Sequence, residues 1–382
     1  MIKLFARRLY LIGCVLLLCS QIAFADQTVP ASKTNKPVNK KSEQAKPAKP
    51  LLPEQIALRD QLRRVVAIVR KQNFNTSEND VGEMLDFCLA FGCSTEITDV
   101  ANNRRLNGIT CVCWNLPCAG YTPLSIVGGH LAPRVGYGHQ QSSSQMAAML
   151  ALSEVPATYP ARSGEITRTV ADIIEGEKLS CLAGTDMALK LVALATYADD
   201  HPWKNALGES WDIDKVVASE LDRPLSTTPH EGVYRWMGIS AALKRYERNR
   251  KPLSEDMQRA KQFETESMQY ALRVQNSGGS WGPAVHRDYA TTLSHTGFML
   301  EWLAMAMTDE QLADPQVARS VEFVVGFLNT AHYQVQMQTM TAKEISAVMH
   351  TVHALNVYDA RLYAPADAVP LTATAAPATA PK

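Results

Sequence analysis

Two kinds of helical segment alternate along the chain, and this alternation limits the possible folds more than any other feature. One kind is amphipathic and charged, and is expected at residues 169–178, 212–220, 254–274 and 315–328. The other is apolar on most faces and rich in Ala, Met and Gly, and is expected at residues 144–152, 185–198, 229–246, 296–307 and 342–358. An all-round apolar helix must be buried, whereas an amphipathic helix lies at the surface. The alternation predicts a mainly α fold, an α/α toroid in which a ring of apolar helices lies inside a ring of amphipathic, antiparallel ones.

The chain before residue 139 departs from this pattern. Helices are expected at residues 54–71 and 78–91, but helical periodicity is lost over residues 92–138, where Gly, Pro, Asn and Cys are frequent. A short strand is expected at residues 109–114, and strand-like alternation is nearly absent after residue 139. We therefore expect a Cys-rich irregular region at the N-terminal end of the helical domain.

Capping residues mark several of the expected helix starts. Ser254 and Asp314 precede charged helical segments, and Asp314 is followed by a proline. Thr228 and Thr341 each begin a capping box, with a glutamate three residues later. These signals predict helices that begin at or just after these four residues.

The stretch between two of these helices carries a recognisable motif. Gln275, Gly279 and Trp281 fit the spacing Q-x-x-x-G-x-W. This spacing resembles the QW turn of the α/α-toroid superfamily of terpenoid cyclase-like and prenyltransferase-like proteins. The resemblance implies a structural turn in which the Gln amide binds a helix end, the Gly permits a tight reversal and the Trp ring packs over the junction.

The motifs of the best-known enzymes of that superfamily are missing or incomplete. The nearest match to the D-x-D-D acid of the cyclases is the run from Asp212 to Lys215, which lacks the last carboxylate. A C-G-E-Q run is absent, and no segment matches the zinc site of the protein prenyltransferases. The resemblance thus implies the scaffold without these chemistries, and a fold alone does not define a function.

Several segments also resemble an uncharacterised family of exported bacterial proteins. They are residues 113–120, 134–138, 203–209 and 350–355, within a likeness that extends from about residue 85 to residue 363. This resemblance implies a shared fold and brings no reaction with it.

The two ends of the chain have the composition of an exported protein. Residues 1–25 have the pattern of a signal peptide, with a basic start, a short apolar stretch and a small-residue cleavage site. Residues 26–53 form a Lys/Pro-rich linker that is expected to be disordered, as is the Ala/Pro/Thr-rich tail at 364–382. Between them, residues 54–363 form a single domain. Cleavage, lipidation and retention as an anchor all remain possible fates of the N-terminus, and we expect no transmembrane span in the mature chain.

Charge excludes one class of partner. Removing Lys3, Arg7 and Arg8 of the signal peptide leaves 35 basic residues against 38 acidic ones, from 38 of each in the whole chain. A nucleic-acid-binding protein is expected to carry a basic surplus, so the sequence predicts no nucleic acid partner.

Cysteines concentrate in the irregular region. The candidates for disulfide bonds are Cys88, Cys93, Cys111, Cys113 and Cys118. With Cys181 they make an even count, which in an oxidising compartment favours disulfides of undetermined pairing. Because the spacing Cys111-x-Cys113-x4-Cys118 brings thiols together, a zinc or iron–sulfur site is the alternative.

Polar residues are rare in the apolar helices, so those present are the candidate catalytic residues. They are Asp186, His230, Arg235, His350 and His353 within these segments, together with His139 and His295 shortly before two of them, and Glu301 lies in the segment that follows His295. In a toroid such groups converge on a central funnel, where they can transfer protons or hold a metal. Each has a structural alternative: Asp186 can stabilise a helix start, Glu301 can pair with a base inside the bundle, and two core histidines can simply be hydrogen-bonded. The sequence specifies no cofactor and no metal.

Three functions remain open. The leading hypothesis is an exported protein, periplasmic, envelope-associated or secreted, that binds or processes an envelope or extracellular substrate. A glycan is the first candidate, cleaved by a lyase- or hydrolase-like reaction. The alternatives are a non-catalytic scaffold or binding module and an isoprenoid-handling protein related to the terpenoid cyclases. The sequence does not specify the oligomeric state.

Overall fold

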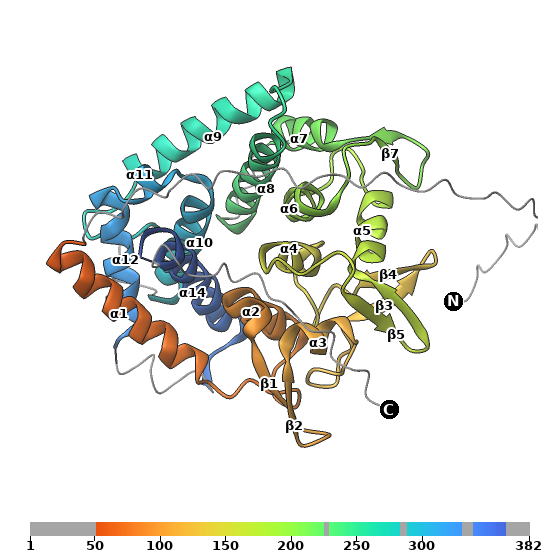
Figure 1. The fold of residues 1–382 in the computed structure, drawn as a ribbon, viewed down its shortest axis with the longest axis horizontal. Helices are drawn as coiled ribbons and strands as arrows, with labels where there is room; N and C mark the ends of the chain where they lie inside the picture. Colours follow the sequence, from red (N-terminus) through yellow and green to blue (C-terminus); the bar gives the residue numbers. More distant parts are fainter. Residues whose placement is uncertain (1–50, 225–228, 283–288, 331–338, 364–382) are drawn as a thin grey trace, which may run out of the picture. The chain divides into compact units, whose positions relative to one another are not determined.

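The computed structural model describes residues 51–224, 229–282, 289–330 and 339–363, which form a mainly helical structure (Figure 1). The helices that are buried on most faces are α2 (Val81–Phe91), α4 (Gln145–Leu152), α6 (Ala188–Tyr197), α8 (Pro229–Arg248), α10 (Tyr289–Ala306) and α14 (Ala342–Leu362). The helices with an exposed charged face are α1 (Pro53–Arg70), α5 (Val170–Leu179), α7 (Ile213–Asp222), α9 (Glu255–Arg273) and α12 (Pro315–Leu328). The prediction of a mainly α fold is confirmed.

The buried helices contact one another in a closed order. Helix α2 packs against α4, α4 against α6, α6 against α8, α8 against α10, α10 against α14, and α14 against α2. The charged helices pack on the outside of these pairs: α5 and α7 contact α6, α9 contacts α8, α12 contacts α10, and α1 contacts both α12 and α14 (Figure 1). Each amphipathic helix therefore buries its apolar stripe against a helix that is apolar on most faces.

Small residues allow two of these pairs to approach closely. A Cβ atom at Gly297 of α10 would collide with the side chain of Thr351 of α14. A Cβ atom at Gly238 of α8 would lie 2.5 Å from the carbonyl oxygen of Ala188 in α6. Because interiors are close-packed, these glycines fix the distance between the helices that carry the polar core residues.

Within the described ranges, four short antiparallel hairpins lie between the helices. They are β1 (Glu96–Asp99) with β2 (Arg104–Asn107), β3 (Leu124–Val127) with β4 (His130–Pro133), β5 (Pro160–Ser163) with β6 (Ile166–Thr169), and β7 (Trp203–Lys204) with β8 (Ser210–Trp211). Their registers pair Glu96 with Asn107, Leu124 with Pro133, Pro160 with Thr169 and Trp203 with Trp211. The last two hairpins lie beyond residue 139, where the sequence shows almost no strand-like alternation. They are too short for alternation to stand out in the sequence.

The expected strand at residues 109–114 is wrong. This segment forms α3 (Gly108–Cys113), a short helix that follows the one-turn 3-10 helix η1 (Gly92–Ser94) and the first hairpin. The side-chain oxygen of Asn107 accepts hydrogen bonds from the backbone N–H groups of Ile109 and Thr110. This cap satisfies helix donors at the start and overrides the strand preference of the β-branched residues.

The turn after α9 makes the contacts that its motif predicts. The side-chain amide of Gln275 donates to the carbonyl of Gln316 in the first turn of α12, at 3.0 Å. Gly279 has a φ of +91°, and a Cβ atom there would collide with the carbonyl of Arg319. Trp281 is buried and donates through Nε1 to the Ala271 carbonyl at 2.7 Å. The turn thus binds the end of α9 to α12.

The predicted capping residues behave as expected where they are described. Ser254, Asp314 and Thr341 each accept a hydrogen bond from the first turn of the following helix. Thr228 lies outside the described residues. None of the helices in the described ranges is long and apolar enough to span a membrane.

Candidate functional site

Polar side chains of α10 and α14 meet inside the helical core. Glu301 of α10 binds two histidines of α14: its Oε2 atom is 2.7 Å from Nδ1 of His350, and its Oε1 atom is 2.5 Å from Nδ1 of His353. The histidines are spaced i,i+3, so they lie on one face of the helix. All three residues are buried, and Glu301 has no exposed surface. One carboxylate therefore orients both imidazole rings.

Burial and ion pairing shift the pKa values of this cluster in opposite directions. Burial by itself raises the pKa of Glu301, but the charge of His350 and hydrogen bonds from both histidines outweigh it and lower that pKa to about 2. Burial lowers the pKa of His350, whereas the charge of Glu301 and the hydrogen bond to it produce a net rise above the ordinary 6.5. Glu301 is therefore ionised at neutral pH, and His350 holds its proton more strongly than a free histidine.

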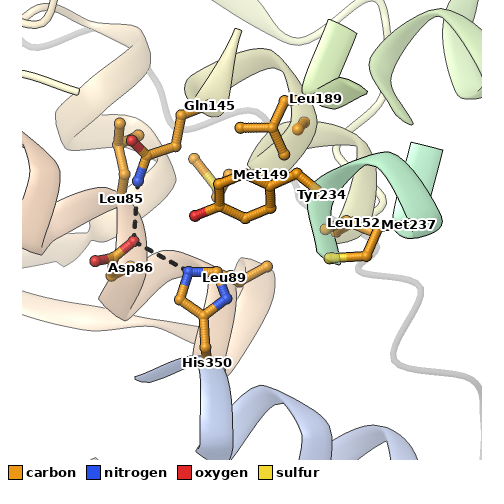
Figure 2. Close-up of a pocket in the computed structure, with 11 residues that line it drawn as sticks. Leu85, Asp86, Leu89, Gln145, Met149, Leu152, Leu189, Tyr234, Met237 and His350 are labelled. Atoms are coloured by element: carbon orange, nitrogen blue, oxygen red, sulfur yellow. Dashed lines mark hydrogen bonds and ion pairs between the residues drawn. The ribbon is translucent and has the colours of Figure 1, made fainter. Parts of the chain in front are cut away.

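The other ring nitrogen of His350 faces a second carboxyl group. Its Nε2 atom is buried without a hydrogen-bond partner, and Oδ1 of Asp86 in α2 lies 3.7 Å away. Gln145, the first residue of α4, donates to the same Asp86 oxygen at 3.1 Å (Figure 2). Burial raises the pKa of Asp86, and the charge of His350 offsets only part of this rise. Phe298 stacks on the imidazole with ring centroids 4.0 Å apart, which fixes the plane of the ring.

A small cavity lies beside Asp86, Gln145 and His350. Its volume is about 20 Å³, enough for about one water molecule. The rest of its lining is mainly apolar, from side chains that include Leu85, Leu89, Met149, Leu189, Tyr234 and Met237 (Figure 2). Five of the six buried helices therefore supply side chains to one point, and α10 supplies Glu301 directly behind His350.

This arrangement is suited to proton transfer. The carboxylate of Glu301 at Nδ1 fixes the tautomer and orientation of the His350 ring and leaves Nε2 directed at Asp86 and the cavity. When His350 is protonated, Nε2 can donate to a bound oxygen atom, and when it is neutral the same atom can accept a proton. Within the part of the chain that the structure describes, no group of three or more His, Cys, Asp or Glu side chains could hold a metal ion.

Arg235 belongs to a second buried cluster, and the exposed Asp186 lies at its edge, 3.4 Å from Arg223. Arg235 of α8 donates to the carbonyls of Arg223 and Pro224 at 2.8 and 2.9 Å, and its Nε atom lies 3.4 Å from Glu220. Glu220 also accepts the backbone N–H of Met187, at 2.8 Å. Asp186 accepts the backbone N–H of Ala188, which is the helix-start role that was the structural alternative. This cluster connects the end of α7 to α8 and to the start of α6.

Two other candidate histidines, His139 and His295, do not line the cavity. His139 lies on the loop before α4, where its Nδ1 atom is 3.0 Å from the carbonyl oxygen of Tyr137 and its ring packs edge-on against Tyr121. His295 of α10 packs against Gly282 in the turn after α9, since a Cβ atom there would lie 2.5 Å from its Nδ1. The side chain of His230 lies outside the described residues.

The cysteines of the irregular region lie close together as thiols. Cys88, Cys111, Cys113 and Cys118 are buried, and Cys93 is half-buried. The Sγ atoms of Cys111 and Cys118 are 3.6 Å apart, beyond the roughly 2.05 Å of a disulfide bond. The six cysteines in the described ranges are all free, so the predicted disulfides stay a prediction.

Two residues of the cavity, Asp86 and Tyr234, were not among the candidates from the sequence. Asp86 is the one acidic residue in the apolar run from Met84 to Phe91, and an isolated acid on a buried helix was the signal that could have identified it. Tyr234 has no such signal, because a tyrosine in an apolar helix is most simply a core residue. Glu301 and the two α14 histidines were found because they interrupt apolar helices.

Comparisons of the chain with models of known protein families, with curated proteins and with solved structures found no match.

Proposed function

We propose that this chain is an exported α/α-toroid protein that uses His350 as a general acid on an envelope or extracellular substrate, with a glycan as the first candidate. The observation that carries the proposal is the His350 ring. Glu301 holds one of its nitrogens, and the other is buried without a hydrogen-bond partner, 3.7 Å from Asp86 and beside the cavity. A buried polar atom without a partner is costly, and a substrate oxygen would satisfy it.

The toroid is supported by the order of the helix contacts. The six buried helices contact one another from α2 round to α14 and back to α2, and the charged helices pack outside them. The turn at Gln275, Gly279 and Trp281 makes the contacts expected of a QW turn. In a toroid the inner helices surround a central site, and the cavity beside Asp86 receives side chains from five of them.

The acid role follows from the protonation states. The pKa of His350 and the pKa of Asp86 are both raised, whereas the pKa of Glu301 is lowered to about 2. A proton shared between His350 and Glu301 therefore stays on His350, because the shifts of the two pKa values are opposite. Cleavage of a glycosidic bond, by hydrolysis or by elimination, requires a proton on the leaving oxygen. His350 would donate the Nε2 proton, and Glu301 would stabilise the imidazolium before the transfer.

A direct test compares His350→Asn with His139→Asn, whose histidine lies on a loop away from the cavity. The thermal midpoint of the full-length protein is first measured against acidic and neutral glycans, peptidoglycan fragments, polyprenyl phosphates and zinc, because a ligand of the folded state raises the midpoint. Cleavage of any glycan that binds is then assayed. We expect His350→Asn to lower kcat by roughly 10²–10⁴-fold and His139→Asn to leave it unchanged. Equal activity in both variants would refute the acid role.

The size of the cavity supports a second candidate, a non-catalytic scaffold. A space of about 20 Å³ admits about one water molecule, so a sugar ring requires the surrounding helices to separate. A scaffold uses the Glu301 cluster only to specify its core, and then no member of the ligand panel raises the midpoint. The convergence of Asp86, Gln145 and His350 weighs against an isoprenoid site, which needs an apolar lining free of such groups.

A further inference from the structure

Two buried cysteines of the irregular region are in direct contact. Cys111 lies in α3 and Cys118 in the loop that follows, and their Sγ atoms are 3.6 Å apart. Neither side chain has exposed surface. A disulfide requires an Sγ–Sγ distance of about 2.05 Å, so the two sulfur atoms together need to move by roughly 1.5 Å, a distance that small side-chain rotations cover.

The backbone around the pair holds the two thiols together. The N–H of Leu116 donates to the carbonyl of Cys111 at 3.1 Å, which turns the chain back at the end of α3. Cys118 and Tyr121 exchange two backbone hydrogen bonds, at 2.8 and 2.9 Å. Ala119 donates to the carbonyl of Thr76, outside the loop, at 2.9 Å. The contact between the thiols is therefore a consequence of a folded loop with defined ends.

We propose that Cys111 and Cys118 are a redox modification site that closes to an intramolecular disulfide. Glutathione disulfide or a protein disulfide is the oxidant. One thiolate attacks the oxidant and forms a mixed disulfide, and the second thiolate displaces the reduced thiol from it. The two cysteines lose two protons and two electrons in total, and the oxidant is reduced to two thiols.

The buried environment determines when the bond can form. The hydrogen bond to Cys118 and then burial hold the pKa of the Cys111 thiol far above its ordinary value. Thiol–disulfide exchange proceeds through the thiolate, so the folded, buried pair reacts slowly. Closure therefore takes place while the region is open, during folding, and the finished bond is protected from reductants.

The bond would stabilise a segment that supports the candidate site. Tyr121, three residues after Cys118, packs so closely on Gly138 that a Cβ atom there would collide with its ring. The carbonyl of Gly138 accepts the N–H of Val81 at the start of α2, the helix that carries Asp86. A crosslink at Cys118 would thus hold the loop that positions the start of α2.

Peptide mapping tests the assignment. Full-length protein is reduced and unfolded, refolded with glutathione disulfide and glutathione, alkylated, and digested without reductant by a protease that cleaves after Trp114. This cut separates Cys118 from Cys111 and Cys113. We expect the two peptides to remain linked in the native protein and in Cys113→Ser, and to separate in Cys111→Ser.

Two results would overturn the proposal. The first is alkylation of Cys118 in the native protein after oxidation, and the second is a crosslink that survives Cys111→Ser but is lost in Cys113→Ser. A Cys111→Ala/Cys118→Ala variant covers the case in which the serine variant does not fold. An eight-residue loop predicts that oxidation raises the thermal midpoint of the native protein by about 5 °C. We expect the midpoint of the double variant not to respond to oxidation.

Discussion

Replacing Glu301 with glutamine removes a buried charge while keeping the volume of the side chain. Glutamine is neutral like a protonated glutamate, so the variant reproduces the protonated cluster at every pH. The pKa of Glu301 is about 2 in the folded protein against an ordinary 4.5, and each pKa unit is worth about 1.4 kcal/mol. Ionised Glu301 therefore contributes about 3 kcal/mol to the free energy of unfolding. Removing one partner of a buried ion pair costs about 3–5 kcal/mol in other proteins, which is the same order.

The pKa values of Glu301 and His350 define the pH range in which Glu301→Gln lowers the free energy of unfolding most. Because the pKa of Glu301 is lowered, its contribution is present above its ordinary 4.5 and is lost as the pH falls through about 2. Because the pKa of His350 is raised, its contribution is complete below its ordinary 6.5 and is lost as the pH rises through the raised value. The difference in the free energy of unfolding between the native protein and Glu301→Gln should thus be greatest between pH 4.5 and 6.5.

Urea unfolding followed by circular dichroism measures this difference. At about pH 5.5 we expect the midpoint of Glu301→Gln to fall by roughly 1 M urea or more, with smaller differences at about pH 3 and pH 8.5. Glu264→Gln is the matched control, since Glu264 is also buried, on α9, and pairs with the exposed Lys261, at 2.9 Å. The charge of Glu301 does not stabilise the fold as described if the free energy of unfolding of Glu301→Gln falls by less than about 1 kcal/mol near pH 5.5, or if this loss does not change with pH.

Three further substitutions test the parts of the fold that surround the site, each by the thermal midpoint and by the free energy of unfolding. Gly138→Ala, at a φ of +72°, should cost about 1–3 kcal/mol more than Gly164→Ala, at a φ of +57°, because only the first places a methyl group against the Tyr121 ring; equal losses would contradict this contact. Gln275→Met should cost about 1–3 kcal/mol, since it leaves carbonyl groups of the turn and of α12 without their donor; a change below about 0.5 kcal/mol would show that the amide is dispensable. Asp212→Ala should cost about 1 kcal/mol through loss of the N-cap of α7, and retention of the native midpoint would exclude this role.

The sequence predicted the helices well, because their signals are local. Ser254 and Thr341 cap helices in the structure as their positions predicted, and the division into apolar and amphipathic helices matches the observed burial. The prediction for the segment after Asn107 was wrong because its β-branched residues favour a strand, while the side chain of Asn107 caps a helix there. In a six-residue element, one capping side chain outweighs the weak intrinsic preference of the other residues.

The candidate site was only partly predictable, since it depends on contacts between distant segments. His350 and His353 were candidates from the sequence, and pairing of Glu301 with a base inside the bundle was the open alternative that the structure shows. Asp86 was missed because it is separated from His350 by more than 260 residues, and no pattern along the chain records that α2 and α14 pack together. Asp186 and Arg235 were included because they lie on apolar helices, but the structure places them where they bind helix ends.

The three titratable groups at the centre also explain how a helical core can retain charge. The lowered pKa of Glu301 favours its negative form and the raised pKa of His350 favours its positive form, while burial raises the pKa of Asp86 and favours its neutral form. The cluster thus approaches charge balance, which is the least costly state for ionisable groups removed from water. Gln145 already donates a hydrogen bond to Asp86, so a proton on Nε2 of His350 is a second donor for which the core supplies no acceptor. The surplus of donors over acceptors faces the cavity, where an oxygen atom of a substrate or of one water molecule would be bound.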